Sequence, residues 1–197
     1  MNRRIFLALL AATSLVACGG DGEAPRFKHT DVSAGNIIPA ATLFDGTGQA
    51  RNFEEFRGKV VIVYFGYTAC PDICPGALRK YASLVRNLRS KDAERVQLVF
   101  VTVDPERDTP ERTDTYVKWF NPGFLGLSGP AEEIAKLAGQ FKVIYSRKEV
   151  EGGMDYVMDH SDSAYLIDPK GQLRLVVPAN ALIEPIVSDL QQLLDEK

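Results

Sequence analysis

The sequence lacks a hydrophobic run long enough to cross a membrane. Its most apolar stretch, Ile5 to Val16, has twelve residues, whereas a spanning helix needs about 20. It also lacks a basic run, and its net charge of −3 argues against nucleic acid as a partner. The absence of internal repeats excludes solenoids and propellers. The 45% hydrophobic content can bury one sizeable core, so we expect one domain.

Cysteine is scarce, with 3 among 197 residues, and the first of them follows a leader-like segment. Arg3 and Arg4 precede the apolar stretch, and the sequence LVAC at 15–18 is typical of a bacterial lipobox. We therefore predict that residues 1–17 are a cleaved lipoprotein signal peptide and that Cys18 becomes the lipidated N-terminus. A buried core helix is the alternative for this stretch. Two cysteines then remain for the folded domain.

Residues 18–37 are rich in Gly, Asp, Ala, Pro and charged residues and show no apolar period. This composition predicts a flexible tether between the lipid and a domain of residues 38–197. His29 lies in the tether, and we expect it to be a solvated histidine outside any site. Loss of residues 1–17 removes two arginines, so the formal charge changes from −3 to −5. Membrane attachment would then depend on the lipid, in the bacterial cell envelope and facing the periplasm.

The other two cysteines, Cys70 and Cys74, lie in the sequence GYTACPDICP at 66–75. Each precedes a proline, which disfavours helical dihedral angles at the cysteine itself. Proline favours the first helical position, so we predict that a helix begins at Pro75. Amides and the positive dipole at a helix N-terminus favour thiolate over thiol. This pattern indicates a redox site or a site for a soft metal.

The rest of the chain shows the pattern of an α/β domain. Residues 59–65 (KVVIVYF) and 96–103 (VQLVFVTV) are apolar and β-branched, as in strands buried on both faces of a sheet. The apolar period after Pro75 predicts a helix between them, which implies a right-handed parallel crossover. Further elements are predicted as follows: strands at 42–44, 124–127 and 141–145, a short helical segment at 53–56, and helices at 110–119, 130–138 and 185–194.

An antiparallel hairpin is predicted near the C-terminus. Residues 163–167 and 172–177 flank the turn sequence Asp168-Pro169-Lys170-Gly171. Together these elements describe a central mixed β-sheet flanked by helices, a thioredoxin-like fold. In open sheets the site lies beyond the carboxyl ends of the strands, which is where Cys70 falls.

Four segments carry a specific resemblance to a known family. They are VIVYFGYTACPDICP at 61–75, VFVTVDPERDTPE at 99–111, FLGLSG at 124–129 and MDHSDSAYLIDPKGQLR at 158–174. Their order and spread over most of the chain from residue 40 onward resemble the Sco (SenC) family of copper-binding, thioredoxin-fold proteins that assist cytochrome c oxidase assembly.

The resemblance implies that Cys70, Cys74 and His160 are copper ligands. Two soft sulfurs suit Cu(I) and an added imidazole suits Cu(II), so such a set can hold both oxidation states. From the residues alone, His160 could equally be an ordinary surface histidine. Asp159 and Asp162 could accept a hydrogen bond from its other ring nitrogen, although solvated loop carboxylates explain them more simply.

Other interpretations remain open for the neighbouring residues. Cys70 and Cys74 could form a structural disulfide, although such a small loop contributes little stability. Asp104 and Asp108 either shape the site loop or serve as ordinary turn and cap residues. We expect Tyr67 and Trp119 to be packing aromatics.

Three classes of function are compatible with these features. The first is a membrane-anchored copper metallochaperone that serves the binuclear copper (CuA) centre of a terminal oxidase. Its partners would be the copper-accepting oxidase subunit and other periplasmic copper or thiol-redox proteins. The second is a thiol-disulfide oxidoreductase that reduces the cysteines of that subunit, with Cys70 and Cys74 as its catalytic residues. The third, a thioredoxin-fold peroxidase, generally carries Thr three residues ahead of its reactive cysteine, and Tyr67 and Pro71 do not fit that pattern.

Overall fold

The computed structural model describes residues 27–150 and 156–196. The predicted signal peptide, Cys18 and residues 19–26 of the predicted tether lie outside the described residues. A six-stranded sheet with the order β1-β10-β9-β4-β5-β6 forms the centre of the fold. Its strands are β1 (Thr30–Asp31), β4 (Val60–Gly66), β5 (Val96–Thr102), β6 (Leu125–Leu127), β9 (Ala164–Ile167) and β10 (Leu173–Val177).

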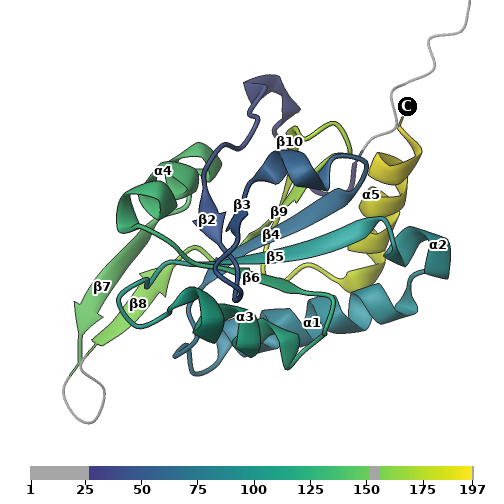
Figure 1. The fold of residues 1–197 in the computed structure, drawn as a ribbon. Coiled ribbons are helices and arrows are strands. Elements are labelled where there is room, and N and C mark those ends of the chain that lie inside the picture. Colours follow the sequence, from purple (N-terminus) through teal and green to yellow (C-terminus); the bar gives the residue numbers. More distant parts are fainter. Residues whose placement is uncertain (1–26, 151–155, 197) are drawn as a thin grey trace, which may run out of the picture.

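Two smaller sheets and the helices complete the fold (Figure 1). One small sheet pairs β2 (Leu43–Phe44) with β3 (Ala50–Arg51), and the other pairs β7 (Tyr145–Glu149) with β8 (Tyr156–His160). The helices are α1 (Ile73–Asn87), α2 (Ser90–Ala93), α3 (Pro110–Lys118), α4 (Ala131–Phe141) and α5 (Ile183–Asp195), with 3-10 turns η1 (Ser33–Gly35) and η2 (Phe53–Phe56).

Strands β4 and β5 are parallel and almost entirely buried, as their apolar runs predict. Alternate residues of a strand face opposite sides of the sheet. Tyr64 therefore packs toward α1 and α3, where its ring lies 6.1 Å from Phe100 and Phe100 lies 5.9 Å from Tyr116. Phe65 points to the other face, 5.4 Å from Phe141 of α4. Helices thus cover both faces of the central sheet.

The predicted hairpin near the C-terminus is confirmed. Strand β10 pairs antiparallel with both β9 and β1, while β4, β5 and β6 run parallel, so the sheet is mixed. In the turn between β9 and β10, the Asp168 carboxylate accepts hydrogen bonds from the amides of Lys170 and Gln172. Gly171 has a φ of +88°, a conformation that glycine adopts without a steric penalty.

Several predicted elements differ from those in the structure. Helix α1 begins at Ile73 rather than Pro75, so Cys74 lies in its first turn. Residues 141–145 are not a strand, because Phe141 ends α4 and the next strand begins at Tyr145. The β7–β8 hairpin was not predicted, since β7 (YSRKE) has mostly exposed polar residues and no apolar alternation. Trp119 was predicted to pack, but it is 86% exposed after the end of α3.

Residues 27–37, predicted to belong to the tether, lie against the domain. Thr30 pairs with Val176 in the sheet, and the Val32 amide donates to the carbonyl of Arg174. The prediction of a solvated His29 is wrong, because its ring contacts Asp189 of α5 at 2.7 Å and both side chains are buried. Polar composition alone could not reveal this buried partner far along the chain. None of the helices within residues 27–150 and 156–196 is long and apolar enough to cross a membrane.

Candidate metal centre

The two cysteines lie where β4 passes into α1. A turn closed by the Cys70 amide and the Tyr67 carbonyl follows the strand, and α1 then begins at Ile73. Asp108, which is fully buried, accepts hydrogen bonds from the Thr68 amide at 2.8 Å, from the Thr68 hydroxyl and from the Thr102 hydroxyl at 2.7 Å. The loop that carries Cys70 is therefore fixed to the end of β5 by a buried carboxylate. The sequence left open whether Asp108 shapes the site loop or is an ordinary turn or cap residue, and the structure supports the first interpretation.

Gly66, the last residue of β4, leaves the space that Cys74 occupies. A Cβ atom on Gly66 would lie 2.7 Å from the Cys74 sulfur and 2.9 Å from the Phe100 ring. No side chain fits at such distances, so the absence of a side chain allows Cys74 to approach the strand. A glycine inside a strand pattern often marks a close approach of this kind, and this signal could have identified Gly66 from the sequence.

The third residue of the site, His160, ends strand β8. Its Nδ1 lies 2.9 Å from the carbonyl oxygen of Ser161, so Nδ1 donates and Nε2 is the nitrogen free to bind a metal. The imidazole stands edge-on to the rings of Tyr64 and Tyr67, with centroids 6.4 and 5.8 Å away. A backbone carbonyl, rather than Asp159 or Asp162, thus orients the ring.

Cys70, Cys74 and His160 meet as one group. Their ligand atoms all lie within 4.8 Å of one another, and the Cys74 sulfur is 3.4 Å from Nε2 of His160. Neither cysteine is in a disulfide, so both sulfurs are available to bind a metal once they are deprotonated. Two sulfurs and one imidazole nitrogen in a largely buried site suit Cu(I) and also accommodate Cu(II). The residues present therefore fit the metal that the sequence analysis predicted.

The charges of the two thiols are strongly coupled. A hydrogen bond from the Cys74 thiol, aided by His160 and by the Cys74 amide 3.4 Å away, outweighs burial and lowers the pKa of Cys70 to about 4. The same hydrogen bond, together with burial, raises the pKa of Cys74. Burial alone would lower the pKa of His160, but its hydrogen bonds to Cys70 and to the Ser161 carbonyl raise it overall. The metal-free site therefore holds one thiolate, centred on Cys70.

Access to the site differs between the two sulfurs. Cys70 lines a hollow of about 300 Å³ together with Tyr67, Ile73 and Met158, and Lys148 and Asp159 stand at its rim. Cys74 is fully buried. Cys70 is itself mostly buried, at 7% exposed, but it is the one of the two cysteines that borders this hollow.

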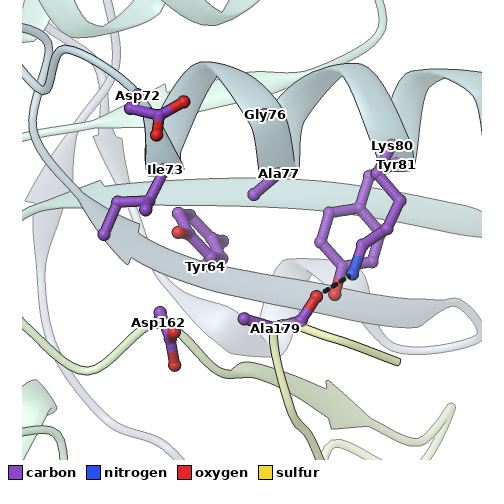
Figure 2. Close-up of a pocket in the computed structure, with 9 residues that line it drawn as sticks. All are labelled: Tyr64, Asp72, Ile73, Gly76, Ala77, Lys80, Tyr81, Asp162 and Ala179. Carbon is purple, nitrogen blue, oxygen red and sulfur yellow. Dashed lines mark hydrogen bonds between the residues drawn. The ribbon is translucent and has the colours of Figure 1, made fainter. Parts of the chain in front are cut away.

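A second cavity, of about 230 Å³, adjoins α1 (Figure 2). Tyr64 lies between Asp72 and Asp162 at one end of it, and Tyr81 and Lys80 lie at the other. The Lys80 amine donates to the carbonyl of Ala179 at 2.8 Å. Burial lowers the pKa of this lysine. Unlike the hollow beside Cys70, this cavity has no cysteine among its lining residues.

The remaining predicted neighbours have structural partners. Asp159 is exposed and pairs with Lys148, as expected for a solvated loop carboxylate. Asp104 is buried and accepts a hydrogen bond from the Tyr156 hydroxyl at 2.7 Å. Tyr67 is buried, as predicted, and packs against His160. Tyr156 was not identified from the sequence, because no local pattern links a hairpin tyrosine to the distant DPER sequence.

Comparison with known proteins identifies relatives along most of the chain. The family described as SCO1/SenC matches residues 31–195. The mitochondrial protein SCO2 homolog of Mus musculus is 40% identical over 152 residues, which are 77% of this chain. This chain covers 60% of that protein's length.

Solved structures show the same fold. Bradyrhizobium japonicum ScoI with copper bound is 36% identical, with a TM-score of 0.71 over 79% of this chain and 98% of that one. The apo Sco1 protein of Thermus thermophilus is also 36% identical, with a TM-score of 0.74 over 86% of this chain and 98% of that one. These neighbours confirm the predicted thioredoxin-like fold. The chain belongs to the SCO1/SenC family.

Proposed function

We propose that the protein binds one copper ion through Cys70, Cys74 and His160 and acts as a copper metallochaperone in cytochrome c oxidase assembly. The observation that carries the proposal is the convergence of two free thiols and an oriented imidazole within 4.8 Å. The copper in the Bradyrhizobium japonicum relative supports it. Copper here is the cargo, and the hollow beside Cys70 is the route by which it reaches an acceptor.

The acceptor that we propose is the copper-binding subunit of a terminal oxidase, with its CuA centre as the destination. Other periplasmic copper or thiol-redox proteins would act as further partners. We also propose that lipid on Cys18 anchors the protein to the bacterial cell envelope, facing the periplasm. The lipobox sequence at residues 15–18 supports this location.

A second function, thiol-disulfide exchange, is favoured by the low pKa of Cys70 and by the hollow that its side chain borders. The Cys70 thiolate would attack a disulfide of the acceptor subunit and form a mixed disulfide, which releases one acceptor thiol. Cys74 would then displace the second acceptor thiol and close a Cys70–Cys74 disulfide. Two electrons pass to the acceptor, whose disulfide becomes two thiols. One of their protons comes from Cys74 and the other from solvent.

Copper titration of the reduced protein, followed by absorption and native mass spectrometry, tests the first function. We expect one copper per chain, and we expect that Cys70→Ser and Cys74→Ser each abolish tight binding, because one thiolate cannot replace a two-sulfur ligand set. Cys18→Ser is the matched control and should retain the stoichiometry. If Cys74→Ser bound Cu(I) as tightly as wild type, Cys70 and Cys74 would not both be copper ligands.

The Cys18→Ser variant also tests the anchor. Without the lipidated cysteine the protein should leave the membrane fraction on carbonate washing. A variant that stays as firmly bound as wild type would show that residues 15–18 do not direct lipidation.

Oxidase assembly at limiting copper distinguishes the two functions. His160→Ala should still cycle between the Cys70/Cys74 thiols and their disulfide, but it should bind Cu(II) more weakly. Failure of this variant to restore the oxidase indicates copper delivery, and full rescue indicates thiol reduction.

A further inference from the structure

The hairpin that carries His160 is not hydrogen-bonded to the central sheet through its strands. Among the described residues, β7 pairs with β8 alone. The hairpin projects from one end of the molecule (Figure 1). The backbone bonds between Ile144 and Ser161 close its base but join the hairpin only to itself. Apart from the chain connections at its base, such as the one from His160 to Ala164 of β9, side-chain contacts determine where this hairpin lies relative to the cysteines.

One side-chain cluster joins the hairpin to the loop after β5. The ring of Tyr156 lies between two guanidinium groups, with the Cζ atoms of Arg107 and Arg147 at 3.6 and 3.7 Å from its centroid. Its hydroxyl donates to Asp104 at 2.7 Å, and Arg107 donates to its backbone carbonyl at 3.0 Å. Arg107 also donates to Asp104. We call Asp104, Arg107 and Tyr156 the Tyr156 clamp.

The clamp connects directly to the metal centre. The guanidinium of Arg107 lies 5.7 Å from the ring of Tyr67, and that ring stands edge-on to His160 at 5.8 Å. Tyr156 and His160 are four residues apart in β8, so their side chains share one face of the strand. The clamp therefore fixes one end of the strand whose other end holds the imidazole.

The clamp shares the loop after β5 with Asp108, whose amide donates to the Asp104 carbonyl at 2.9 Å, but its side chains make other contacts than those that hold the cysteines. Cys70 and Cys74 depend on the strand β4, on Gly66 and on the bonds from Asp108 to Thr68. None of those contacts involves the hairpin. Loss of the clamp would therefore displace His160 and leave the cysteine pair in place.

We propose that Tyr156, held by Asp104 and Arg107, is the positioning residue that places His160 against the cysteine pair. The clamp touches no ligand atom and acts on the metal only through the hairpin. The proposal rests on the proposed function, because it takes His160 to be the ligand that distinguishes Cu(II) from Cu(I). Its consequence is that changes at Asp104 and at Tyr156, 52 residues apart in the sequence, weaken Cu(II) binding alike.

The test compares Tyr156→Leu, which removes the ring and the hydroxyl, with Tyr156→Phe, which removes the hydroxyl only. Tyr165→Phe is the matched control, since Tyr165 is equally buried but packs on Phe65 and Phe141. Tyr156→Leu should weaken Cu(II) about 10-fold or more, as for partners that orient a metal ligand, and change its absorption and EPR spectra. Cu(I) affinity should change less than about 3-fold.

A second measurement is made on the metal-free, reduced protein. The nuclear Overhauser contact between the rings of Tyr67 and His160 should persist in wild type and in Tyr165→Phe. It should weaken in Tyr156→Phe and vanish in Tyr156→Leu. This result does not depend on copper. If the protein bound no copper, the proposed function would be contradicted, and the contact between the two rings would still test whether Tyr156 positions His160.

Two outcomes would overturn the clamp. One is an unchanged ring contact and Cu(II) affinity in Tyr156→Leu. The other is an equal loss of Cu(I) and Cu(II) affinity together with a lowered melting temperature, which would make Tyr156 a general structural residue. If Tyr156→Leu does not fold, Asp104→Asn decides by the same measurements.

Discussion

The cysteine half and the histidine half of the site are held in different ways. Cys70 and Cys74 follow a fully buried central strand, and their loop is bonded to the buried Asp108. His160 ends a two-stranded hairpin whose first strand is mostly exposed. The sulfurs are thus held next to the central sheet, whereas the imidazole is held by a hairpin outside that sheet.

This difference in how the two halves are held suits a site that both binds an ion and releases it. The two sulfurs suffice for Cu(I), while the imidazole matters more for Cu(II). Elements with few buried contacts open at low free energy, whereas core strands open only with global unfolding. The hairpin can therefore change the third ligand without disturbing the sulfur pair.

The largest effect is expected from filling the space beside Cys74. Gly66→Ala places a Cβ 2.7 Å from the Cys74 sulfur, so it should reduce the free energy of unfolding by about 1–3 kcal/mol and weaken Cu(I) and Cu(II) together. Gly76→Ala is the control, because no atom lies within 4 Å of the added Cβ in α1. Denaturant unfolding and copper competition measure both. Equal stability of the two variants would show that the close approach is not a constraint.

A comparable loss of stability is expected at the bonds that hold the cysteine loop. Asp108→Asn keeps the size of the side chain but removes the charge that accepts from Thr68 and Thr102. Such bonds contribute about 1.5–3 kcal/mol each, and the amide retains some of them, so a loss of about 2 kcal/mol is expected. Both copper affinities should fall, unlike in the clamp variants. Asp159→Asn, at an exposed pair with Lys148, should change neither measurement.

The smallest predicted change is in the pH dependence of Cys70 reactivity. Its pKa of about 4, against an ordinary 9.0, keeps it a thiolate from pH 5 to 8. Iodoacetamide should therefore alkylate it at a nearly constant rate over that range, whereas an ordinary thiol slows about 10-fold per pH unit. Cys74→Ala removes the main hydrogen bond and should restore the ordinary slope. A 10-fold change in the alkylation rate per pH unit in wild type would show that the pKa of Cys70 is not lowered.

The same low pKa has a consequence for stability. Because the pKa of Cys70 is lowered on folding, its thiolate stabilises the reduced protein fully above the unfolded pKa near 9. This contribution is lost progressively as the pH falls from 9 to about 4. Thermal unfolding of the reduced protein at several pH values between 4 and 9 should show it, and Cys74→Ala should reduce it.

The sequence was sufficient for the elements with a strong apolar period. Strands β4, β5, β9 and β10 are close to their predicted ranges, because continuous or alternating apolar residues indicate buried strands. The start of α1 was two residues too late, since the proline rule describes a preference and Cys74 fits within the first turn.

The parts that could not be predicted depend on contacts between distant residues. The β7–β8 hairpin is stabilised by charged and aromatic side chains rather than by an apolar stripe, so the periodicity of its sequence gave no signal. His29 is buried by Asp189, which lies 160 residues away. The three proposed ligands came from the family resemblance and the thiol spacing. The bond from the His160 ring to the Ser161 carbonyl and the contacts of the clamp required the structure.

In the proposed site the two sulfurs bind both oxidation states of copper, and the imidazole matters most for Cu(II). The most direct test measures the Cu(I) and Cu(II) affinities of wild type and His160→Ala by competition with chelators of known affinity. We predict that the variant binds Cu(II) at least about 10-fold more weakly, with an altered spectrum, while Cu(I) binding and the Cys70/Cys74 couple remain. Unchanged Cu(II) affinity and spectrum would contradict the account, because His160 would then not be a ligand.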